Sequence, residues 1–343
     1  MESLQAHSIR MAMMALCVLA TGSAFAGTIR DDRSDQLYLD LAGASSAYAS
    51  VGQFIGTGAD STGSYSFAGS GVLIANNWVL TAGHVSESTT TSLTFKIGGQ
   101  SFASDQFFAH SNWDGNLGKG YDIGLVHFAD DLVLQTGLAA AELYSGKNEV
   151  GEIATAVGFG TTGTGLTGWQ SGSLDKRAGN NVIDATYNTP GKNDRILLTD
   201  FDNPHTTADN NFGSATPLDL EYMTAPGDSG GGLFINVGGA DLLAGITSFG
   251  WGRLDGSADS DYGDVGGYTR VSQFVDWINS YTGLGGGRDG KGGGKGGNGG
   301  GGGGGNGKGG GKPTLLITAV PEPSTMGLLG VGMIMIVRRR RKA

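Results

Sequence analysis

The sequence predicts an all-β domain that ends in a single helix, and three observations support this prediction. Short runs of β-branched and aromatic residues recur between about residues 50 and 281. Clusters of Gly, Asn, Asp and Ser separate these runs, as turns separate the strands of a barrel or a sandwich. The last segment instead places apolar residues at i, i+3, i+4 and i+7, as an amphipathic helix does; these residues are Val271, Phe274, Val275 and Ile278. The expected strands are 71–74, 78–80, 123–128, 154–159, 233–235 and 242–249.

Residues 1–26 have the layout of a secretory signal peptide. Arg10 precedes an uninterrupted apolar run at 11–20, and the small-residue pattern Ala-Phe-Ala follows at 24–26. The apolar run is too short to span a bilayer. We therefore expect export and a mature chain that begins near Gly27. The alternative interpretation of this run is a buried helix of the domain.

Composition excludes several kinds of site and partner. The only cysteine, Cys17, lies in the predicted signal peptide, so residues 27–284 can hold no disulfide, zinc–thiolate site or cysteine nucleophile. The net charge of −10 divides into −18 for residues 1–284 and +8 for the remainder. An acidic body argues against nucleic-acid binding and favours solubility outside the cell. No residue pattern indicates a cofactor.

An acidic stretch from Asp255 to Asp264 is the one candidate for metal binding. Its carboxylate and backbone oxygens are of the type that binds Ca²⁺. The acids have no fixed ligand spacing, however. We therefore expect solvated surface charge here and no metal site.

Acyl transfer from a peptide needs a nucleophile, a base, a carboxylate that orients the base, and donors for the oxyanion. The candidate base is His84, which follows the expected strand 78–80 on a turn of small residues. From such a turn a ring can face a cleft, and the near-neutral pKa of an imidazole suits a general base. The chain has five histidines, and any of them alone could equally be structural.

The candidate carboxylate is Asp122, which opens the apolar strand 123–128. An acid at this position is expected to be partly buried, and a buried carboxylate needs a hydrogen-bonding or charged partner. A histidine N–H would serve. Taken alone, an Asp before a strand is more often a turn residue.

The candidate nucleophile is Ser229, in the glycine-rich segment 227–232. Glycines on both sides permit a tight backbone that exposes the hydroxyl and aims successive N–H groups at one point. In the order His84, Asp122, Ser229, the three segments resemble the trypsin/chymotrypsin family of serine proteases. The further stretches that match the family are 69–78, 157–162, 245–250 and 267–272.

This resemblance implies two six-stranded antiparallel β-barrels with the active site between them, followed by a C-terminal α-helix. It implies a secreted serine endopeptidase that acts through an acyl-enzyme. Ser229 would attack the scissile carbonyl, His84 would shuttle the proton, and Asp122 would fix the imidazole tautomer. The N–H groups of Gly227 and Ser229 would form the oxyanion hole. Asp228 resembles the family acid that binds a freed N-terminal amine.

The resemblance also assigns the substrate-binding residues. The backbone of Ser248, Phe249 and Gly250 would pair with an extended substrate as an added strand, and the Ser248 hydroxyl would support Asp122. Met223, six residues before the candidate nucleophile, would form the floor of the primary pocket. A methionine there predicts an apolar or undemanding preference instead of one for Arg or Lys.

Two features depart from the family pattern. Gly69 and Val85 stand where the family has a disulfide beside its histidine, and the joint loss of both cysteines fits a working disulfide-free branch. The family exposes an Ile or Val amine on activation. Removing two residues from a chain that begins at Gly27 would expose Ile29 in this way.

The C-terminal part divides into a linker, 285–312, and a tail, 313–343. Glycine fills 20 of the 28 linker positions, which predicts a flexible chain. In the tail, Pro-Glu-Pro at 321–323 precedes an apolar segment, 324–337, and a basic end. This order resembles the bacterial PEP-CTERM sorting signal, which implies processing by a membrane-embedded, exosortase-like transpeptidase. The short apolar segment predicts a transient membrane anchor; an unprocessed membrane tail is the alternative.

The sequence as a whole therefore predicts an exported serine endopeptidase of a Gram-negative type bacterium, sorted through its C-terminal segment and acting on protein or peptide substrates. Two alternatives remain. One is a non-catalytic surface or matrix-binding protein built on a protease scaffold. The other is an esterase, since the same three residues hydrolyse esters.

Overall fold

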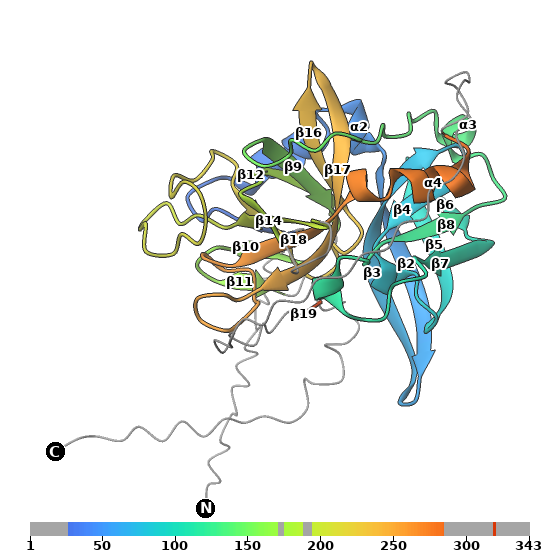
Figure 1. Cartoon of the computed structure of the whole chain (residues 1–343), viewed down its shortest axis with the longest axis horizontal. Coiled ribbons are helices and arrows are strands. Elements are labelled where there is room, and N and C mark those ends of the chain that lie inside the picture. Colours follow the sequence, from blue (N-terminus) through green and yellow to red (C-terminus); the bar gives the residue numbers. More distant parts are fainter. Residues whose placement is uncertain (1–26, 171–174, 188–193, 285–317, 320–343) are drawn as a thin grey trace, which may run out of the picture.

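The residues that the computed structural model describes are 27–170, 175–187, 194–284 and 318–319. They form two β-rich lobes side by side (Figure 1). The predicted signal peptide, the Gly-rich linker and the apolar segment of the tail lie outside the described residues. Within the described ranges, no helix has the length and apolarity needed to cross a membrane. The predicted all-β fold with a C-terminal helix is confirmed.

The N-terminal lobe is built on one antiparallel sheet of seven strands in the order β6-β5-β2-β3-β4-β8-β7, one strand more than expected. Burial alternates along the first part of β2, because successive side chains of a strand point to opposite faces. Phe54 on β2 and Phe95 on β5 are fully buried, with ring centroids 4.7 Å apart. The strands are β2 (Val51–Asp60), β3 (Gly63–Ala75), β4 (Trp78–Thr81), β5 (Thr90–Ile97), β6 (Gln100–Ala103), β7 (Gln106–Ala109) and β8 (Gly124–His127).

The C-terminal lobe holds a second antiparallel sheet, in the order β12-β9-β16-β17-β18-β14-β13, with β19 on the edge of β17. The hairpin between β16 and β17 turns at Gly238 and Gly239, which both have positive φ. Two such residues match the twist of the strands that they join. The strands are β9 (Ile153–Gly158), β12 (Arg177–Val182), β13 (Ala185–Tyr187), β14 (Ile196–Asp200), β16 (Gly232–Val237), β17 (Ala240–Trp251), β18 (Val265–Arg270) and β19 (Thr318–Ala319).

A small four-stranded sheet holds the start of the described chain. Its order is β11-β10-β1-β15, where β1 runs parallel to β10 and antiparallel to β15. Thr28 in the middle of β1 is completely buried, so this segment is part of the packed domain. The strands are β1 (Gly27–Ile29), β10 (Thr162–Thr164), β11 (Gly168–Gln170) and β15 (Tyr222–Met223).

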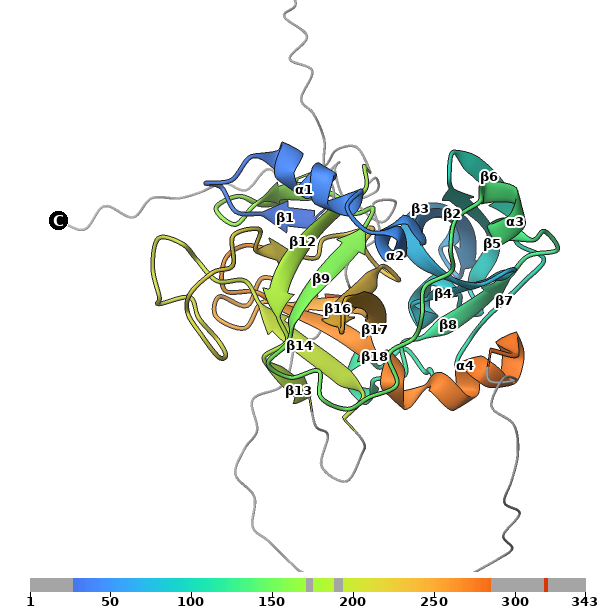
Figure 2. The ribbon, with the colours of Figure 1, turned by 90° about the horizontal axis from the view of Figure 1, so that it is seen from above.

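The C-terminal helix packs against the opposite lobe. A 3-10 turn, η3 (Val271–Gln273), leads into α4 (Val275–Thr282), and Ile278 is fully buried. In Figure 2 α4 lies beside β7 and β8 of the N-terminal lobe. The ring of Tyr281 lies 4.7 Å from that of Phe108 on β7. The helix therefore ties the end of the domain to the first lobe.

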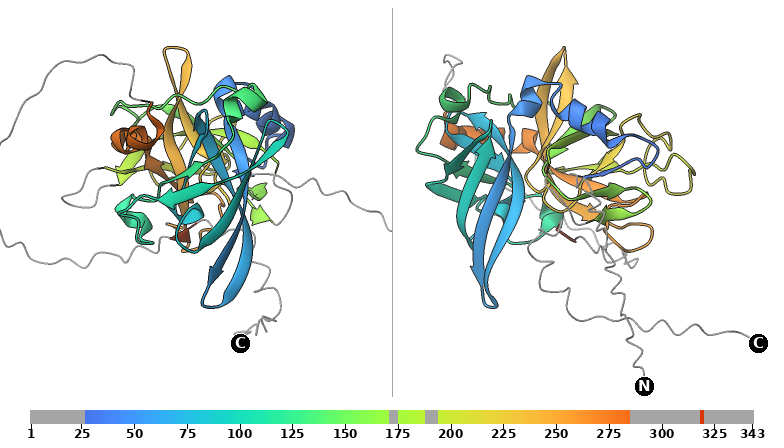
Figure 3. Two further views of the ribbon diagram at one scale, coloured as in Figure 1. Left: turned by 90° about the vertical axis from the view of Figure 1, so that its right-hand side faces the viewer. Right: turned by 180° about the vertical axis from the view of Figure 1, so that it is seen from behind.

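Three short helices in the described residues were not expected from the sequence: α1 (Asp35–Ala42), α2 (Ser46–Ala49) and α3 (Leu132–Thr136). Figure 3 shows α1 and α2 on the outer side of the lobes. Asp35 at the start of α1 forms a bidentate ion pair with the buried Arg177 of β12, at 2.6 and 2.8 Å. The contact joins residues far apart in sequence, which local periodicity cannot reveal.

Four acids gather within the C-terminal lobe: Asp184, Asp200, Asp202 and Glu221. Burial and the neighbouring Asp200 raise the pKa of Asp184, and burial raises the pKa of Glu221 to about 9. A carboxyl whose pKa is raised in the folded state contributes stability that declines progressively once the unfolded chain begins to lose its proton. This contribution is fully present below pH 4.5, the ordinary pKa of Glu221, and is lost as the pH rises through about 9.

Stability should therefore fall as the pH rises across this window. We expect a lower midpoint of thermal unfolding at pH 8.5 than at pH 5.5, followed by calorimetry. The substitution Glu221→Gln should flatten this dependence, whereas Asp276→Asn on the exposed surface of α4 should leave it unchanged. A midpoint that rises from pH 5.5 to pH 8.5 would contradict the expectation.

Candidate active site

His84 and Asp122 lie at the ends of two neighbouring strands. β4 and β8 pair antiparallel, with Thr81 opposite Gly124. The residues that follow β4 and those that precede β8 are therefore side by side. His84 lies on the 3-10 turn η1 (Gly83–Val85) just after β4, and Asp122 lies two residues before β8. The sheet register thus brings together two residues that are 38 positions apart.

The carboxylate of Asp122 holds His84 at two points. One oxygen, Oδ2, lies 2.8 Å from the ring Nδ1, and Oδ1 accepts the backbone N–H of His84, also at 2.8 Å. The hydroxyl of Ser248 donates to Oδ2 at 2.5 Å. Asp122 is fully buried, and three donors now satisfy its charge. A neutral ring that donates its Nδ1 proton to this carboxylate carries its lone pair on Nε2.

Ser229 lies between the two lobes. Its carbonyl accepts the N–H of Ser70 on β3 at 2.8 Å, and the next residue, Gly230, donates to the carbonyl of Thr247 on β17 at 2.9 Å. Gly230 has φ +84°, and a Cβ there would meet Thr81 Oγ1 at 2.1 Å. Only glycine fits this close approach. The Ser229 hydroxyl is buried and makes no hydrogen bond within the described residues.

The candidate oxyanion donors, Gly227 and Ser229, lie in the loop that leads into β16. Gly227 adopts φ +98°, and its carbonyl accepts the hydroxyl of Ser70 at 2.9 Å. No hydrogen bond from the N–H of Gly227 or of Ser229 is found among the described residues. Both N–H groups are therefore available to a bound oxygen.

Asp228 is held by groups of the fold itself. Its carboxylate accepts the N–H of Gly160 at 2.8 Å, the N–H of Ala225 at 2.9 Å and the hydroxyl of Tyr222 at 3.1 Å. Burial raises its pKa to about 6. Tyr222 also pairs with Ile29 of β1 through the backbone. Tyr222 therefore connects β1 to the carboxylate of Asp228.

The predicted substrate strand is an edge of β17. Of its three residues, Ser248 turns its hydroxyl to Asp122. Phe249 is buried, and its ring lies 2.3 Å from where a Cβ on Gly267 would stand, so its side chain packs into the sheet. Gly250 presents backbone alone. At this edge of β17, the main-chain groups are therefore the ones that could pair with another strand.

Met223 lies beneath Gly250, with its Cε 3.6 Å from where a Cβ on Gly250 would stand. It is completely buried and forms a small cluster with Phe201 and Tyr262. Its side chain is therefore packed within the lobe, and its role as the floor of a primary pocket stays a prediction.

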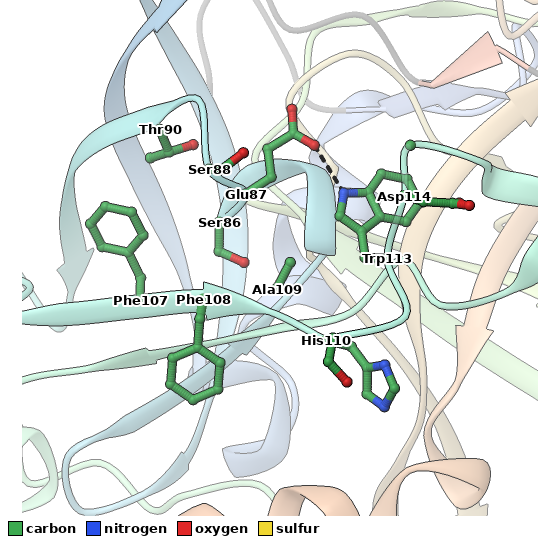
Figure 4. A pocket seen from close by; sticks show the side chains of 12 residues that line it. Ser86, Glu87, Ser88, Thr90, Phe107, Phe108, Ala109, His110, Trp113 and Asp114 are labelled. Atoms are coloured by element: carbon green, nitrogen blue, oxygen red, sulfur yellow. Dashed lines mark hydrogen bonds between the residues drawn. The ribbon is translucent and has the colours of Figure 1, made fainter.

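Sequence reasoning missed a pocket of about 520 Å³ beside His84. Figure 4 shows Glu87 and Trp113 joined in its lining, where Nε1 of Trp113 donates a hydrogen bond to Oε2 of Glu87 at 2.9 Å. Phe107 of β7 also lines the pocket. The Trp113 and His84 ring centroids are 6.5 Å apart. The one feature of the sequence that could have indicated this pocket is Trp113 itself, a large aromatic residue in the loop before Asp122.

The acidic stretch brings three carboxylates together. Oxygens of Asp255, Asp259 and Asp261 lie within 4.8 Å of one another, at a partly exposed position. Burial and the other acids raise the pKa of Asp261 to about 6.

Gly69 and Val85 are in contact. A Cβ placed on Gly69 would lie 3.4 Å from Cγ2 of Val85 and 3.3 Å from the carbonyl oxygen of Ser229. Cγ2 and Cγ1 of Val85, at 3.4 and 3.6 Å from that position, are each one bond from the Val85 Cβ, and the two Cβ atoms of a disulfide are typically about 3.5–4.5 Å apart. The pair Gly69→Cys and Val85→Cys should therefore form a disulfide, provided that the serine carbonyl shifts slightly.

We expect this engineered disulfide to raise the free energy of unfolding by about 3 kcal/mol, because it closes a loop of roughly 15 residues. Denaturant unfolding with and without reductant measures the difference, and the two single cysteine variants are the controls. Two free thiols in the oxidised double variant would show that the backbone cannot reach the required geometry.

The comparisons with known proteins bear on both parts of the chain. The model of the family "Trypsin" matches residues 43–278, which is more than half of the chain. The chain belongs to the trypsin family. The matched range contains both lobes and all three candidate catalytic residues, so the expected serine protease domain is confirmed at the level of the family.

Two animal proteases illustrate the similarity. The chain is 27% identical to brachyurin of Leptuca pugilator over 233 residues, which cover 62% of this chain and 87% of the relative. It is 47% identical to CLIP domain-containing serine protease B14 of Anopheles gambiae over 55 residues, 16% of this chain and only 13% of that relative.

Two solved structures, of the serine protease neuropsin and of a collagenase, also align with the chain. Neuropsin from mouse brain aligns at 21% identity with a TM-score of 0.44, covering 62% of this chain and 87% of that one. The HL collagenase structure aligns at 20% identity with a TM-score of 0.47, covering 68% and 93%.

The end of the chain matches a second family model, the PEP-CTERM protein-sorting motif, over residues 319–342. This motif indicates exosortase-dependent sorting to the cell surface in bacteria. The predicted sorting signal is thereby confirmed as a motif.

Proposed function

We propose that this trypsin-family protein is an active serine endopeptidase with His84, Asp122 and Ser229 as its catalytic triad. One observation carries the proposal: the buried Asp122 carboxylate binds both the ring and the backbone of His84. This arrangement fixes the ring as a base, beside a serine hydroxyl that no described group engages.

The proposed mechanism follows from these positions. Nε2 of His84 removes the Ser229 proton as the hydroxyl oxygen attacks the scissile carbonyl. Asp122 stabilises the imidazolium that forms, and the N–H groups of Gly227 and Ser229 hold the oxyanion; each such donor typically contributes about 10²–10³ in rate. The imidazolium then protonates the leaving amine. Water hydrolyses the acyl-enzyme by the same steps in reverse.

The proposed specificity is for an apolar or otherwise undemanding residue before the cleaved bond. The apolar cluster of Met223, Phe201 and Tyr262, which lies beneath Gly250, supports this proposal. The edge at Ser248 to Gly250 would hold the substrate backbone as an added strand. Sequence preference would then come from pockets on either side of that strand.

We propose that the chain is organised as a signal peptide, 1–26, a protease domain, 27–284, a linker, 285–312, and a sorting segment, 313–343. Export would expose the protease outside the cytoplasm, and the apolar segment would anchor it in the membrane until an exosortase-like enzyme acts on the tail. We do not expect the mature chain to begin at Ile29, since removing Gly27 and Thr28 would delete most of β1.

Profiling of the cleavage products from a peptide library would test this function, with the Ser229→Ala variant in parallel. We expect cleavage after apolar residues by the unmodified protein alone. Turnover of ester substrates without any peptide cleavage would favour the esterase. Binding of a matrix polymer that Ser229→Ala does not affect, without turnover, would favour a binding protein.

A further inference from the structure

One edge of β17 is left open by its neighbours in the sheet. On one side β17 pairs with β18 as far as Trp251. On the other side its pairing with β16 ends where Ile246 faces Gly232, because the chain before β16 turns away toward Ser229. From Ser248 onward, β16 therefore leaves this edge of the β17 backbone unpaired, on the side of the candidate nucleophile. Free strand edges are templates for pairing with a further strand.

A segment of this same chain occupies that edge. β19, which is Thr318–Ala319, pairs antiparallel with β17, with Ala319 opposite Phe249 and Thr318 opposite Gly250. Figures 1 and 3 draw β19 at the boundary between the two lobes. The pairing joins the protease domain to the residues that immediately precede the Pro-Glu-Pro sequence.

The edge lies next to the candidate triad. Ser248, the residue before the paired ones, donates to the carboxylate of Asp122, and Thr247 accepts the N–H of Gly230. An antiparallel strand on this edge lies where the proposed function puts the substrate backbone. β19 and a peptide substrate would therefore need the same main-chain groups.

We propose that the segment at Thr318–Ala319 is a tethered competitor, resident on the substrate edge until a peptide displaces it; this inference rests on the proposed function. Two paired residues form a weak contact by themselves. A tether of about 30 residues raises the local concentration of the segment to the order of mM.

This balance predicts partial and reversible occupancy. If the free segment binds with a dissociation constant of about 0.1–1 mM, tethering at mM concentration raises KM roughly two- to ten-fold and leaves kcat unchanged. The segment would thus raise the concentration that a weakly bound peptide needs in order to occupy the edge. It would not abolish activity.

The test separates the segment from the folded, full-length protein. A recognition site for a second protease is inserted between Gly303 and Gly304, and the chain is cut after folding, so that dilution frees the tail. Amide hydrogen exchange over residues 248–251 is measured before and after the cut in the Ser229→Ala variant. KM and kcat are measured in the protein with Ser229 intact.

We expect the cut to speed exchange at 248–251 and to lower KM, each two- to ten-fold. The full-length double substitution of Thr318→Pro with Ala319→Pro, which removes both N–H groups, should reproduce both changes without the cut. The control, Thr318→Ala with Ala319→Ser, keeps the N–H groups and should behave as the uncut protein.

The two proposals fail in different ways. Unchanged exchange and unchanged KM in a protein that hydrolyses peptides would overturn the competitor and leave the peptidase standing. Absence of hydrolysis before and after the cut would count against the peptidase, while exchange would still decide whether the edge is occupied. Cleavage of the chain at 318–319 that depends on Ser229 would also overturn the competitor, because the segment would then be a substrate.

Discussion

Replacing Ser229 with alanine should lower the rate of peptide hydrolysis by about 10⁶-fold while the fold stays intact. The variant would lose the proposed nucleophile, and the remaining members of a triad cannot compensate because they act as a unit. Stability should change little, since the hydroxyl makes no hydrogen bond within the described residues. The measurement is kcat/KM on the best peptide from the library, together with the midpoint of thermal unfolding.

The matched control for this substitution is Ser66→Ala, at an exposed position of β3. It removes the same atoms from the same residue type and should leave kcat/KM unchanged. A Ser229→Ala variant that retained more than a hundredth of the activity would mean that another group is the nucleophile.

The second large effect is expected for Asp122→Asn, with a loss of about 10⁴ in kcat at neutral pH. The carboxylate accepts three donors: the ring and the backbone N–H of His84, and the Ser248 hydroxyl. An amide of the same shape has one acceptor oxygen. If that oxygen keeps the backbone N–H, the amide NH₂ faces Nδ1 and forces the proton onto Nε2, which removes the base.

Nitrogen NMR of His84 would follow this change of tautomer independently of the rate. Ser248→Ala is the control, because it removes one donor from Asp122 and leaves the pairing with the ring; its loss of activity should be far smaller. An Asp122→Asn protein within ten-fold of the unmodified one would show that the acid does not set the tautomer.

Local sequence predicted the parts of the site that depend on short segments. His84 and Asp122 each adjoin an apolar run that forms a strand, β4 and β8, and the pairing of these strands brings the two residues together. The glycines around Ser229 indicated a tight loop, and positive φ at Gly227 and Gly230 agrees with that indication.

The remaining features depend on contacts between distant segments. The pairing of Thr28 with Met223 spans 195 residues, and nothing in the local pattern of residues 27–29 indicates a buried strand. Periodicity likewise cannot show that Trp113 forms a hydrogen bond with Glu87 in the lining of a pocket. The occupant of the β17 edge was also unforeseen, because two residues are too few to give a strand signal.

The central claim is that His84, held by Asp122, activates Ser229 in the folded protein. The most direct test is labelling with a fluorophosphonate, which reacts with an activated serine hydroxyl, followed by mass mapping of the modified residue. The account predicts stoichiometric modification of Ser229 that His84→Ala prevents. An unmodified Ser229 in protein that is folded and hydrolyses peptides would contradict it.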